Sequence, residues 1–331
     1  MRLLVLGGTV FLSKAVAALA VERGWDVTVA ARGVSGEPPP GVHFVPIDRS
    51  TPEGVAPLAG ESFDAVVDVA RVPGHVGVVL DALADNAAHW TFVSTCSVYA
   101  DNATPGQVAA TAPLLEPTDP TSFDGDIELY GRSKVACEKL VLDRLPDRAL
   151  VIRAGLIIGP GDVGDRFGHW PHRIAKGGEV LAPGGPEEKV QFIDVDDLAT
   201  WILDAAEAKT SGVHDGIRPP MTRKDFLDQI AAALDVEPEF TWVAQQFLVD
   251  HGIAPWSGEE SLGLWLPLPE YDGFLTRDTS SAVAAGMNYR PLAETVHRWR
   301  AAAAEPPVLK AGISSEKETS VLDAWHARND D

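Results

Sequence analysis

Short apolar runs alternate with helix-spaced apolar positions over the first 155 residues of the chain. The runs predict strands at Arg2–Leu6, Asp26–Ala30, Val42–Pro46, Ala65–Val69, Trp90–Ser94 and Ala149–Ala154. Apolar residues at helical spacing predict helices between them, at Phe11–Arg23, about His75–Ala84 and Asp126–Leu145. This order is typical of an α/β fold with a doubly wound parallel sheet, in which ligands bind beyond the carboxyl ends of the strands.

The pattern loosens after Gly155. Val195–Ala208 is expected to be a helix, and the stretch from Gly216 onward carries many aromatic residues. We interpret that stretch as a smaller lobe over the ligand edge of the sheet, whose aromatic side chains are more often core than ligand contacts. A capping box, Ser315-x-x-Glu318, predicts a short surface helix over Ser315–Ala327. Residues Asp101–Asp124 are expected to form a loop.

Composition narrows the class of protein. Of the 331 residues, 27 are Lys or Arg and 48 are Asp or Glu, which gives a formal charge of −21. So acidic a chain lacks the basic surface that nucleic acids or anionic membranes require. Only two cysteines are present, so a reducing cytoplasm is expected. Met1–Ala20 resembles a secretory signal, but glycines and Lys14 interrupt its apolar run, and a strand–helix unit is the better interpretation.

The turn between the first strand and the first helix reads Gly7-Gly8-Thr9-Val10-Phe11-Leu12-Ser13. A tight turn at this place directs backbone N–H groups and a helix N-terminus at a pyrophosphate. We therefore expect the following residues to contact a dinucleotide cofactor: Gly7, Thr9, Val10, Phe11 and Leu12. Val10 and Ser13 occupy two positions where glycine is usual, which predicts a looser grip on the cofactor.

The end of the second strand bears on the choice of cofactor. A site for NAD usually places an acid here, whereas this chain has Arg32. A guanidinium binds phosphate with two parallel hydrogen bonds, so Arg32 favours the 2′-phosphate of NADP(H) over NAD(H). Asp48, which closes the third strand, is a candidate acceptor for the adenine amino group.

Tyr130 and Lys134 carry the clearest chemical signal. Their spacing of four places both side chains on one face of the long predicted helix. A free tyrosine, with a pKa near 10, is a poor base, but a nearby ammonium favours the phenolate and makes proton exchange possible at neutral pH. A cluster of hydroxyl residues, Ser94–Tyr99, follows the fifth strand.

With these motifs the chain resembles the short-chain dehydrogenase/reductase superfamily, specifically its extended members related to nucleotide-sugar epimerases and dehydratases. The resemblance covers about residues 1–215 and implies that Tyr130 and Lys134 are catalytic, that Lys134 also binds the nicotinamide ribose, and that Thr95 polarises a substrate carbonyl. Further matching segments are Arg153–Pro160 and Gln191–Asp197, where Asp194 replaces the usual histidine. The resemblance also implies a Rossmann domain over 1–160, rejoined by about 189–215, a substrate lobe and tail over 161–188 and 216–331, and a possible homodimer.

Two other groups of residues are given ordinary roles. His169 and His172 lie near Asp162 and Asp165, but Pro171 disrupts a regular helical pair, so no metal site is expected. Cys96 has no neighbouring cation to lower its thiol pKa and is expected to be a packed side chain.

The sequence favours an NADP(H)-dependent reductase of a small-molecule ketone, with Tyr130 as proton donor. The first alternative is a nucleotide-sugar epimerase or dehydratase that recycles its cofactor, and the second is a non-catalytic, cofactor-bound regulatory protein. The scarcity of cations after residue 215 favours the reductase, since a diphosphate substrate needs them; the main ones are Arg218, Arg223, Lys224, Arg277 and Arg290. The expected partner is therefore a small-molecule substrate, with no nucleic acid and no membrane.

Overall fold

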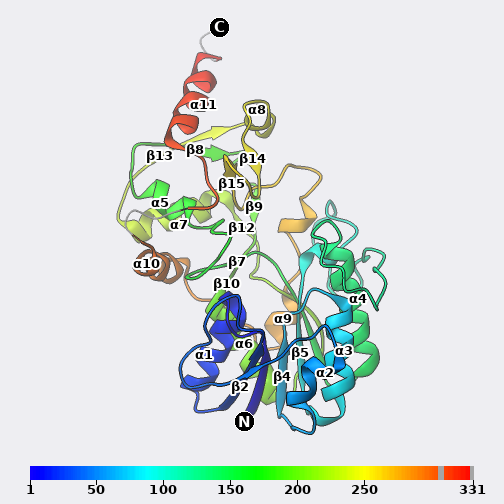
Figure 1. The fold of residues 1–331 in the computed structure, drawn as a ribbon. Helices are drawn as coiled ribbons and strands as arrows, with labels where there is room; N and C mark the ends of the chain where they lie inside the picture. Colours follow the sequence, from blue (N-terminus) through cyan, green and yellow to red (C-terminus); the bar gives the residue numbers. More distant parts are fainter. Residues whose placement is uncertain (305–308, 329–331) are drawn as a thin grey trace.

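Seven parallel strands form one sheet in the order β11-β6-β5-β4-β1-β2-β3 in the computed structural model, which describes residues 1–304 and 309–328 (Figure 1). Its strands are β1 (Arg2–Leu6), β2 (Asp26–Ala31), β3 (His43–Pro46), β4 (Ala65–Asp68), β5 (Trp90–Thr95), β6 (Ala149–Ala154) and β11 (Gly212–Gly216). The predicted doubly wound α/β fold is therefore confirmed.

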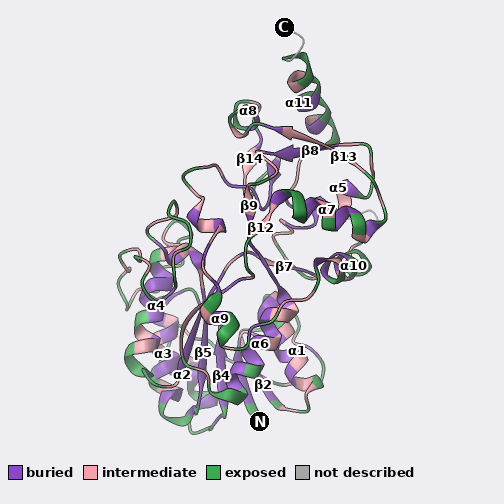
Figure 2. Ribbon diagram, turned by 180° about the vertical axis from the view of Figure 1, so that it is seen from behind, coloured by how far each residue is buried: buried purple, intermediate pink, exposed green. Residues whose placement is uncertain are grey.

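Helices cover both faces of this sheet, because successive side chains of each buried strand point to opposite sides. Leu3 and Val5 pack on one face with α1 (Phe11–Glu22) and α6 (Val195–Ala208). Leu4 and Leu6 pack on the other face, which is covered by α2 (Pro52–Val55), α3 (Pro73–Leu83) and α4 (Tyr130–Arg144). Figure 2 shows the strands buried between the two helical layers.

A second lobe lies beyond the carboxyl ends of the strands (Figure 1). Its helices are α5 (His169–Ile174), α7 (Arg223–Leu234), α8 (Gln245–Asp250), α10 (Leu292–Ala302) and α11 (Ser315–Ala327). A separate apolar core holds it together, in which Phe226, Trp265 and Trp299 are buried and Trp242, Phe247 and Trp256 are partly buried. Short α9 (Ser280–Ala284) packs back on β11, and the exact domain boundaries stay a prediction.

Short strand pairs and single turns complete the described secondary structure. The pairs are β7 (Ile157–Ile158) with β10 (Ile193–Asp194), β9 (Lys189–Val190) with β12 (Met221–Thr222), β8 (Glu179–Pro183) with β13 (Glu239–Val243), and β14 (Ala254–Pro255) with β15 (Ser261–Leu262). The 3₁₀ turns are η1 (Ala56–Leu58), η2 (Ala84–Asn86), η3 (Cys96–Val98) and η4 (Gly273–Leu275).

One helix start and one helix cap differ from the sequence prediction. Helix α4 begins at Tyr130 and not at Asp126, because aspartate side chains cap backbone N–H groups in the preceding segment, including that of Glu128. Helix α11 is capped by Ser314, whose hydroxyl accepts from the Lys317 N–H, while Glu318 is buried against Arg173. Within the described part of the chain, no helix is both long and apolar enough to cross a membrane.

Candidate active site

The turn after β1 has the backbone geometry that a bound phosphate group requires. Gly7 and Gly8 have φ of 123° and 74°, and a Cβ on Gly8 would lie 2.7 Å from the Val29 side chain. No side chain caps the N-terminus of α1, which begins directly after this turn. Its first-turn N–H groups therefore remain available to an anion, and the helix dipole favours one there.

Val10 and Ser13, which replace the usual glycines, fit into this turn. The Ser13 hydroxyl donates to the Val10 carbonyl oxygen over 2.9 Å, and Ser13 is buried against Gly7. Val10 lines the adjoining cavity, so its side chain narrows the space in which a cofactor would bind. The turn thus keeps a backbone geometry that can bind phosphate. That Val10 and Ser13 weaken the affinity for a cofactor stays a prediction.

A cavity of about 350 Å³ opens beside the turn and reaches the ends of β2 and β3. Five of the predicted cofactor residues line it, namely Gly7, Thr9, Val10, Arg32 and Asp48, whereas Phe11 and Leu12 do not. Arg49 and His75, which the sequence did not single out, line it as well. A cavity with a phosphate cradle at one end and a carboxylate and two guanidiniums at the other fits the adenosine half of a dinucleotide.

Some of the charged side chains at the far end of this cavity already form hydrogen bonds or ion pairs within the protein. Asp48 accepts from the Ser50 N–H and hydroxyl, and these bonds lower the pKa of its carboxyl. Arg49 donates to the Asp68 carboxylate over 2.8 Å, whereas the exposed Arg32 makes no ion pair with any described residue. Arg32 is thus the guanidinium that a phosphate would reach without breaking an existing pair.

Thr95 and Tyr130 meet at the carboxyl edge of the sheet. Thr95 ends β5 and caps η3 by accepting from the Ser97 N–H, while Tyr130 opens α4. Burial raises the pKa of the Tyr130 phenol, and the neighbouring Thr95 hydroxyl opposes that rise. A protonated phenol near a hydroxyl at a ligand-binding edge can exchange a proton with a substrate oxygen.

Lys134 lies one helical turn beyond Tyr130 and is buried. Its Nζ donates to the backbone carbonyls of Ala70, over 2.8 Å, and Val93, over 2.5 Å. Nζ also lies 4.2 Å from the centre of the Phe92 ring. Burial lowers the pKa of Lys134 to about 8. The ammonium is thus fixed between the ends of β4 and β5, the place that a cofactor ribose would approach.

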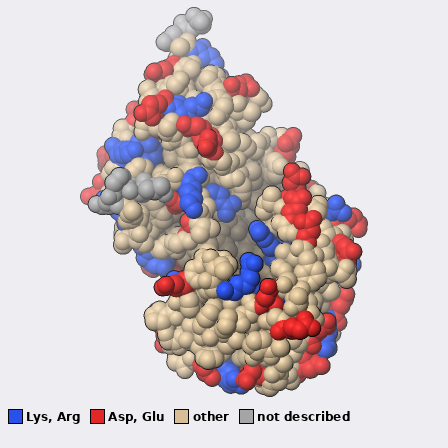
Figure 3. Space-filling model, viewed as in Figure 1, with Lys and Arg blue, Asp and Glu red and all other residues tan. Residues whose placement is uncertain are grey.

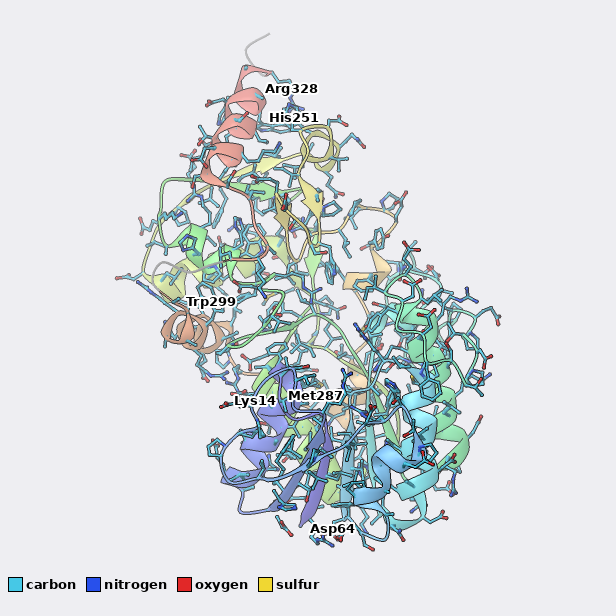
Figure 4. The ribbon with its side chains drawn as sticks, in the orientation of Figure 1. Lys14, Asp64, His251, Met287, Trp299 and Arg328 are labelled. Carbon is cyan, nitrogen blue, oxygen red and sulfur yellow. The ribbon has the colours of Figure 1, made fainter. Side chains whose placement is uncertain are left out.

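Two guanidiniums that the sequence did not single out act on Tyr130. Arg71, just after β4, and Arg166, in the segment before α5, are the cations that most lower its pKa. Neither forms an ion pair with any described residue, and Arg166 lies over the Trp256 ring. Figure 3 shows a hollow between the two lobes with Lys and Arg atoms along its walls. In Figure 4, Lys14 on α1 lies on the side of the sheet lobe that faces the second lobe, and Asp64, just before β4, lies at the opposite end.

Most cations counted in the second lobe are already paired. Arg223 pairs with Glu188, Lys224 with Asp228, Arg277 with Asp215, and Arg290 with Asp197. Arg218, just after β11, differs from these: it lies over the Phe192 ring, and its buried Nε has no partner among the described residues. Besides Arg32, the described residues near the sheet edge thus include three guanidiniums without an ion pair, Arg71, Arg166 and Arg218, of which only Arg218 was in the sequence-based count.

A buried polar network supports α4. Glu138 lies on the same face of α4 as Tyr130 and Lys134, accepts from the Ser94 hydroxyl, and pairs with Arg153 over 2.7 Å. Because Ser94 directly precedes Thr95, this network ties α4 to the strand that carries Thr95. The repeated spacing of four from Tyr130 to Glu138 is the sequence signal that could have identified it.

The residues that the sequence analysis considered as metal ligands or as a reactive thiol are buried or hydrogen-bonded within the fold. Asp165 accepts from the indole of Trp299, which Figure 4 labels on α10, over 3.2 Å. His169 is buried, and burial lowers its pKa to about 3. Burial raises the pKa of the Cys96 thiol, whose Sγ donates to the Arg153 carbonyl. No three His, Cys, Asp or Glu side chains of the described residues are grouped as metal ligands would be.

Comparison with known proteins finds a family similarity over part of the chain. The family model of the NAD dependent epimerase/dehydratase family matches residues 78–217. The human epimerase family protein SDR39U1 is 26% identical over 263 residues, which cover 71% of this chain and 80% of that protein.

Solved structures of low identity share the fold. The Bordetella bronchiseptica enzyme WbmH in complex with NAD⁺ superposes with a TM-score of 0.62 at 18% identity, over 91% of this chain and 97% of that chain. The UDP-glucose 4-epimerase of Thermus thermophilus in complex with NAD gives 0.61 at 19% identity, over 92% and 100%. Residues 78–217 are therefore similar to the NAD dependent epimerase/dehydratase family, and the chain shares the fold of these solved enzymes.

Proposed function

We propose that this protein is a nicotinamide-dinucleotide-dependent enzyme that takes a hydride from an anionic, sugar-like substrate and returns it to the same substrate molecule, as an epimerase or dehydratase does. The observation that carries the proposal is that Arg71 and Arg166, which form no ion pair with a described residue, lie near enough to Tyr130 to lower the pKa of its phenol. Guanidiniums in this position suit a phosphate or diphosphate group held next to the reacting carbon.

This proposal reverses the order of preference that the sequence suggested. The ketone-reductase interpretation depended on a scarcity of cations in the second lobe, but Arg71 and Arg166 lie outside the stretch after residue 215. The names of the similar proteins also favour the first alternative, since they include UDP-glucose 4-epimerases.

The proton chemistry is assigned to Tyr130 and its neighbours. A bound nicotinamide dinucleotide would supply the acceptor and donor of a hydride. As a phenolate, the form that Arg71 and Arg166 favour, Tyr130 takes the proton of the substrate hydroxyl in the oxidation and returns it in the reduction, so no proton is consumed overall. Thr95 orients that hydroxyl, Lys134 holds the ribose side of the site, and Arg71 with Arg166 binds the anionic group.

We assign the adenosine end of the cofactor to the cavity lined by Thr9, Arg32 and Asp48. Arg32 supports a preference for NADP(H), because no acid stands at the end of β2 to accept both ribose hydroxyls and the guanidinium is free. The similar solved structures contain NAD, so the preference is a property proposed for this chain alone.

The reductase remains a second candidate, favoured by Val10, which narrows the cofactor cavity and would ease cofactor release. A panel of nucleotide sugars, incubated with the purified protein loaded with NADP⁺ or NAD⁺ and followed by NMR, distinguishes the two. Conversion of one sugar into an isomer or a dehydrated ketone without loss of cofactor supports the proposal. Net oxidation of NADPH with a neutral ketone, and no conversion of any nucleotide sugar, would contradict it.

A further inference from the structure

Asp68, at the end of β4, is a buried carboxylate to which the proposed mechanism assigns no role. Asp68 is fully buried, and its Oδ1 accepts from Arg49 Nη1 over 2.8 Å and from the Ala70 N–H over 2.9 Å. Its Oδ2 has no hydrogen-bond partner among the described residues. A buried carboxylate oxygen without a donor is costly, so a fold retains one where its charge has a use.

Lys134 is a second buried charged group that contacts Ala70. The Lys134 ammonium binds the carbonyl of Ala70, the same residue whose N–H binds Asp68. Lys134 has only backbone carbonyls and an aromatic ring as direct partners, and no carboxylate lies within salt-bridge distance among the described residues. The two buried groups of opposite charge are thus held on either side of one residue.

The other charged groups around Lys134 do not replace Asp68. Glu138 and Cys137 lie on its own helix, and Glu138 is already paired with Arg153. Arg49, from the loop after β3, opposes the Lys134 charge, while Asp68 supports it. Asp68 therefore stands between two cations, one lining the adenosine cavity and one on the catalytic helix.

We propose that Asp68 is a positioning residue, a buried counter-ion shared by Arg49 and Lys134 that keeps the Lys134 ammonium charged and directed at the Ala70 end of the cofactor site. This inference deepens the proposed function and rests on it for the role of Lys134 toward a ribose. Asp68 touches neither substrate nor cofactor in this assignment and acts only through Lys134.

The charge of Lys134 can be followed without any cofactor. In protein labelled with ¹³C at the lysine ε-carbon, a pH titration by NMR should show one signal with a midpoint near pH 8, which Lys134→Met assigns by removing it. Asp68→Asn keeps the shape and the acceptor for Ala70 but removes the charge, so the midpoint should fall by about one unit or more. Asp85→Asn is the matched control, because Asp85 also pairs with an arginine over 2.8 Å but at the surface.

Arg49→Gln provides the opposite test and keeps the proposal falsifiable should Asp68→Asn fail to fold. Removing that cation should raise the Lys134 midpoint, because Asp68 then acts on Lys134 alone. An unchanged midpoint in Asp68→Asn, or a fall of the midpoint in Arg49→Gln, would overturn the proposal.

Measuring the binding of NADPH and NADH to the same proteins tests whether the charge of Lys134 acts on the proposed cofactor site. The pH at which affinity is lost should move with the Lys134 midpoint in Asp68→Asn, whereas a merely structural defect would lower affinity equally at every pH. If the wild-type protein binds no nicotinamide nucleotide, the proposed function fails, and the NMR titration still decides the role of Asp68.

Discussion

The two ends of the carboxyl edge of the sheet differ in how far their ionisable side chains are exposed to solvent. At the adenosine end Arg32 and Asp48 are exposed, and short loops after β2 and β3 carry them. At the catalytic end Lys134 is buried, Tyr130 is half-buried, and burial shifts the pKa of both. Exposed charges select a ligand by direct contact and are screened by salt, whereas buried ones hold defined protonation states for chemistry. Substitutions at the two ends should therefore differ in size and in pH dependence.

The largest effect is expected for Tyr130→Phe. Loss of the phenolic proton carrier should lower turnover by about 10²–10⁴-fold, the usual worth of general acid–base catalysis, while cofactor affinity stays nearly unchanged. Steady-state kinetics on the converted substrate, together with cofactor titration, measures both quantities. Tyr271→Phe is the control, a partly buried tyrosine of the second lobe. Near-normal turnover in Tyr130→Phe would assign the proton to another group.

Lys134 should affect the pH dependence of the unfolding free energy as well as activity. Its folded pKa of about 8 lies below its ordinary value of 10.5, so between these pH values the unfolded chain binds more protons and stability rises with pH. The wild-type unfolding free energy should therefore gain up to about 1.4 kcal/mol per pH unit from about pH 8 to pH 10, relative to Lys134→Met. Denaturant titrations at several pH values measure this difference. If the unfolding free energies of the two proteins changed with pH in parallel, the pKa of Lys134 would not be lowered by folding.

Removal of a substrate-side guanidinium should have a smaller effect. Arg166→Ala should lower kcat/KM for an anionic substrate by about 10–100-fold, the worth of a charged hydrogen bond of about 1.5–3 kcal/mol. Cofactor binding should not change, because Arg166 does not line the adenosine cavity. Arg144→Ala, which breaks a surface pair with Asp85, is the control. Equal losses for charged and neutral substrates would count against an anion at this place.

The smallest effect belongs to the adenosine end. Arg32→Ala should weaken NADPH by about tenfold, which is about 1.4 kcal/mol of phosphate contact, and leave NADH nearly unchanged. The difference should shrink at high salt, because Arg32 is exposed. Fluorescence titration with both nucleotides measures it, and Arg300→Ala, an exposed site on α10, is the control. Equal losses for NADPH and NADH would remove the basis for NADP preference.

The sequence predicted the sheet well because buried strands carry their own signal. Each predicted strand of the large sheet lies within a residue of the observed one at either end, and the glycine turn and the Tyr130–Lys134 pair follow from local spacing. Arg71 and Arg166 could not be found this way, since only the tertiary fold brings them to Tyr130 and neither lies in a motif. The start of α4 was misplaced because helical periodicity does not register aspartate side chains that cap the chain before Tyr130.

The central claim is that this active site oxidises and re-reduces one substrate with the same cofactor molecule, and the fate of the nucleotide tests it most directly. The protein should be loaded with NADP⁺, dialysed, analysed for bound nucleotide by mass spectrometry, and then given substrate while absorbance at 340 nm is followed. We predict that the nucleotide stays bound and that many turnovers proceed with no added cofactor and no net change in absorbance. Loss of the nucleotide on dialysis, with one NADPH consumed for each product formed, would contradict the account and support a reductase.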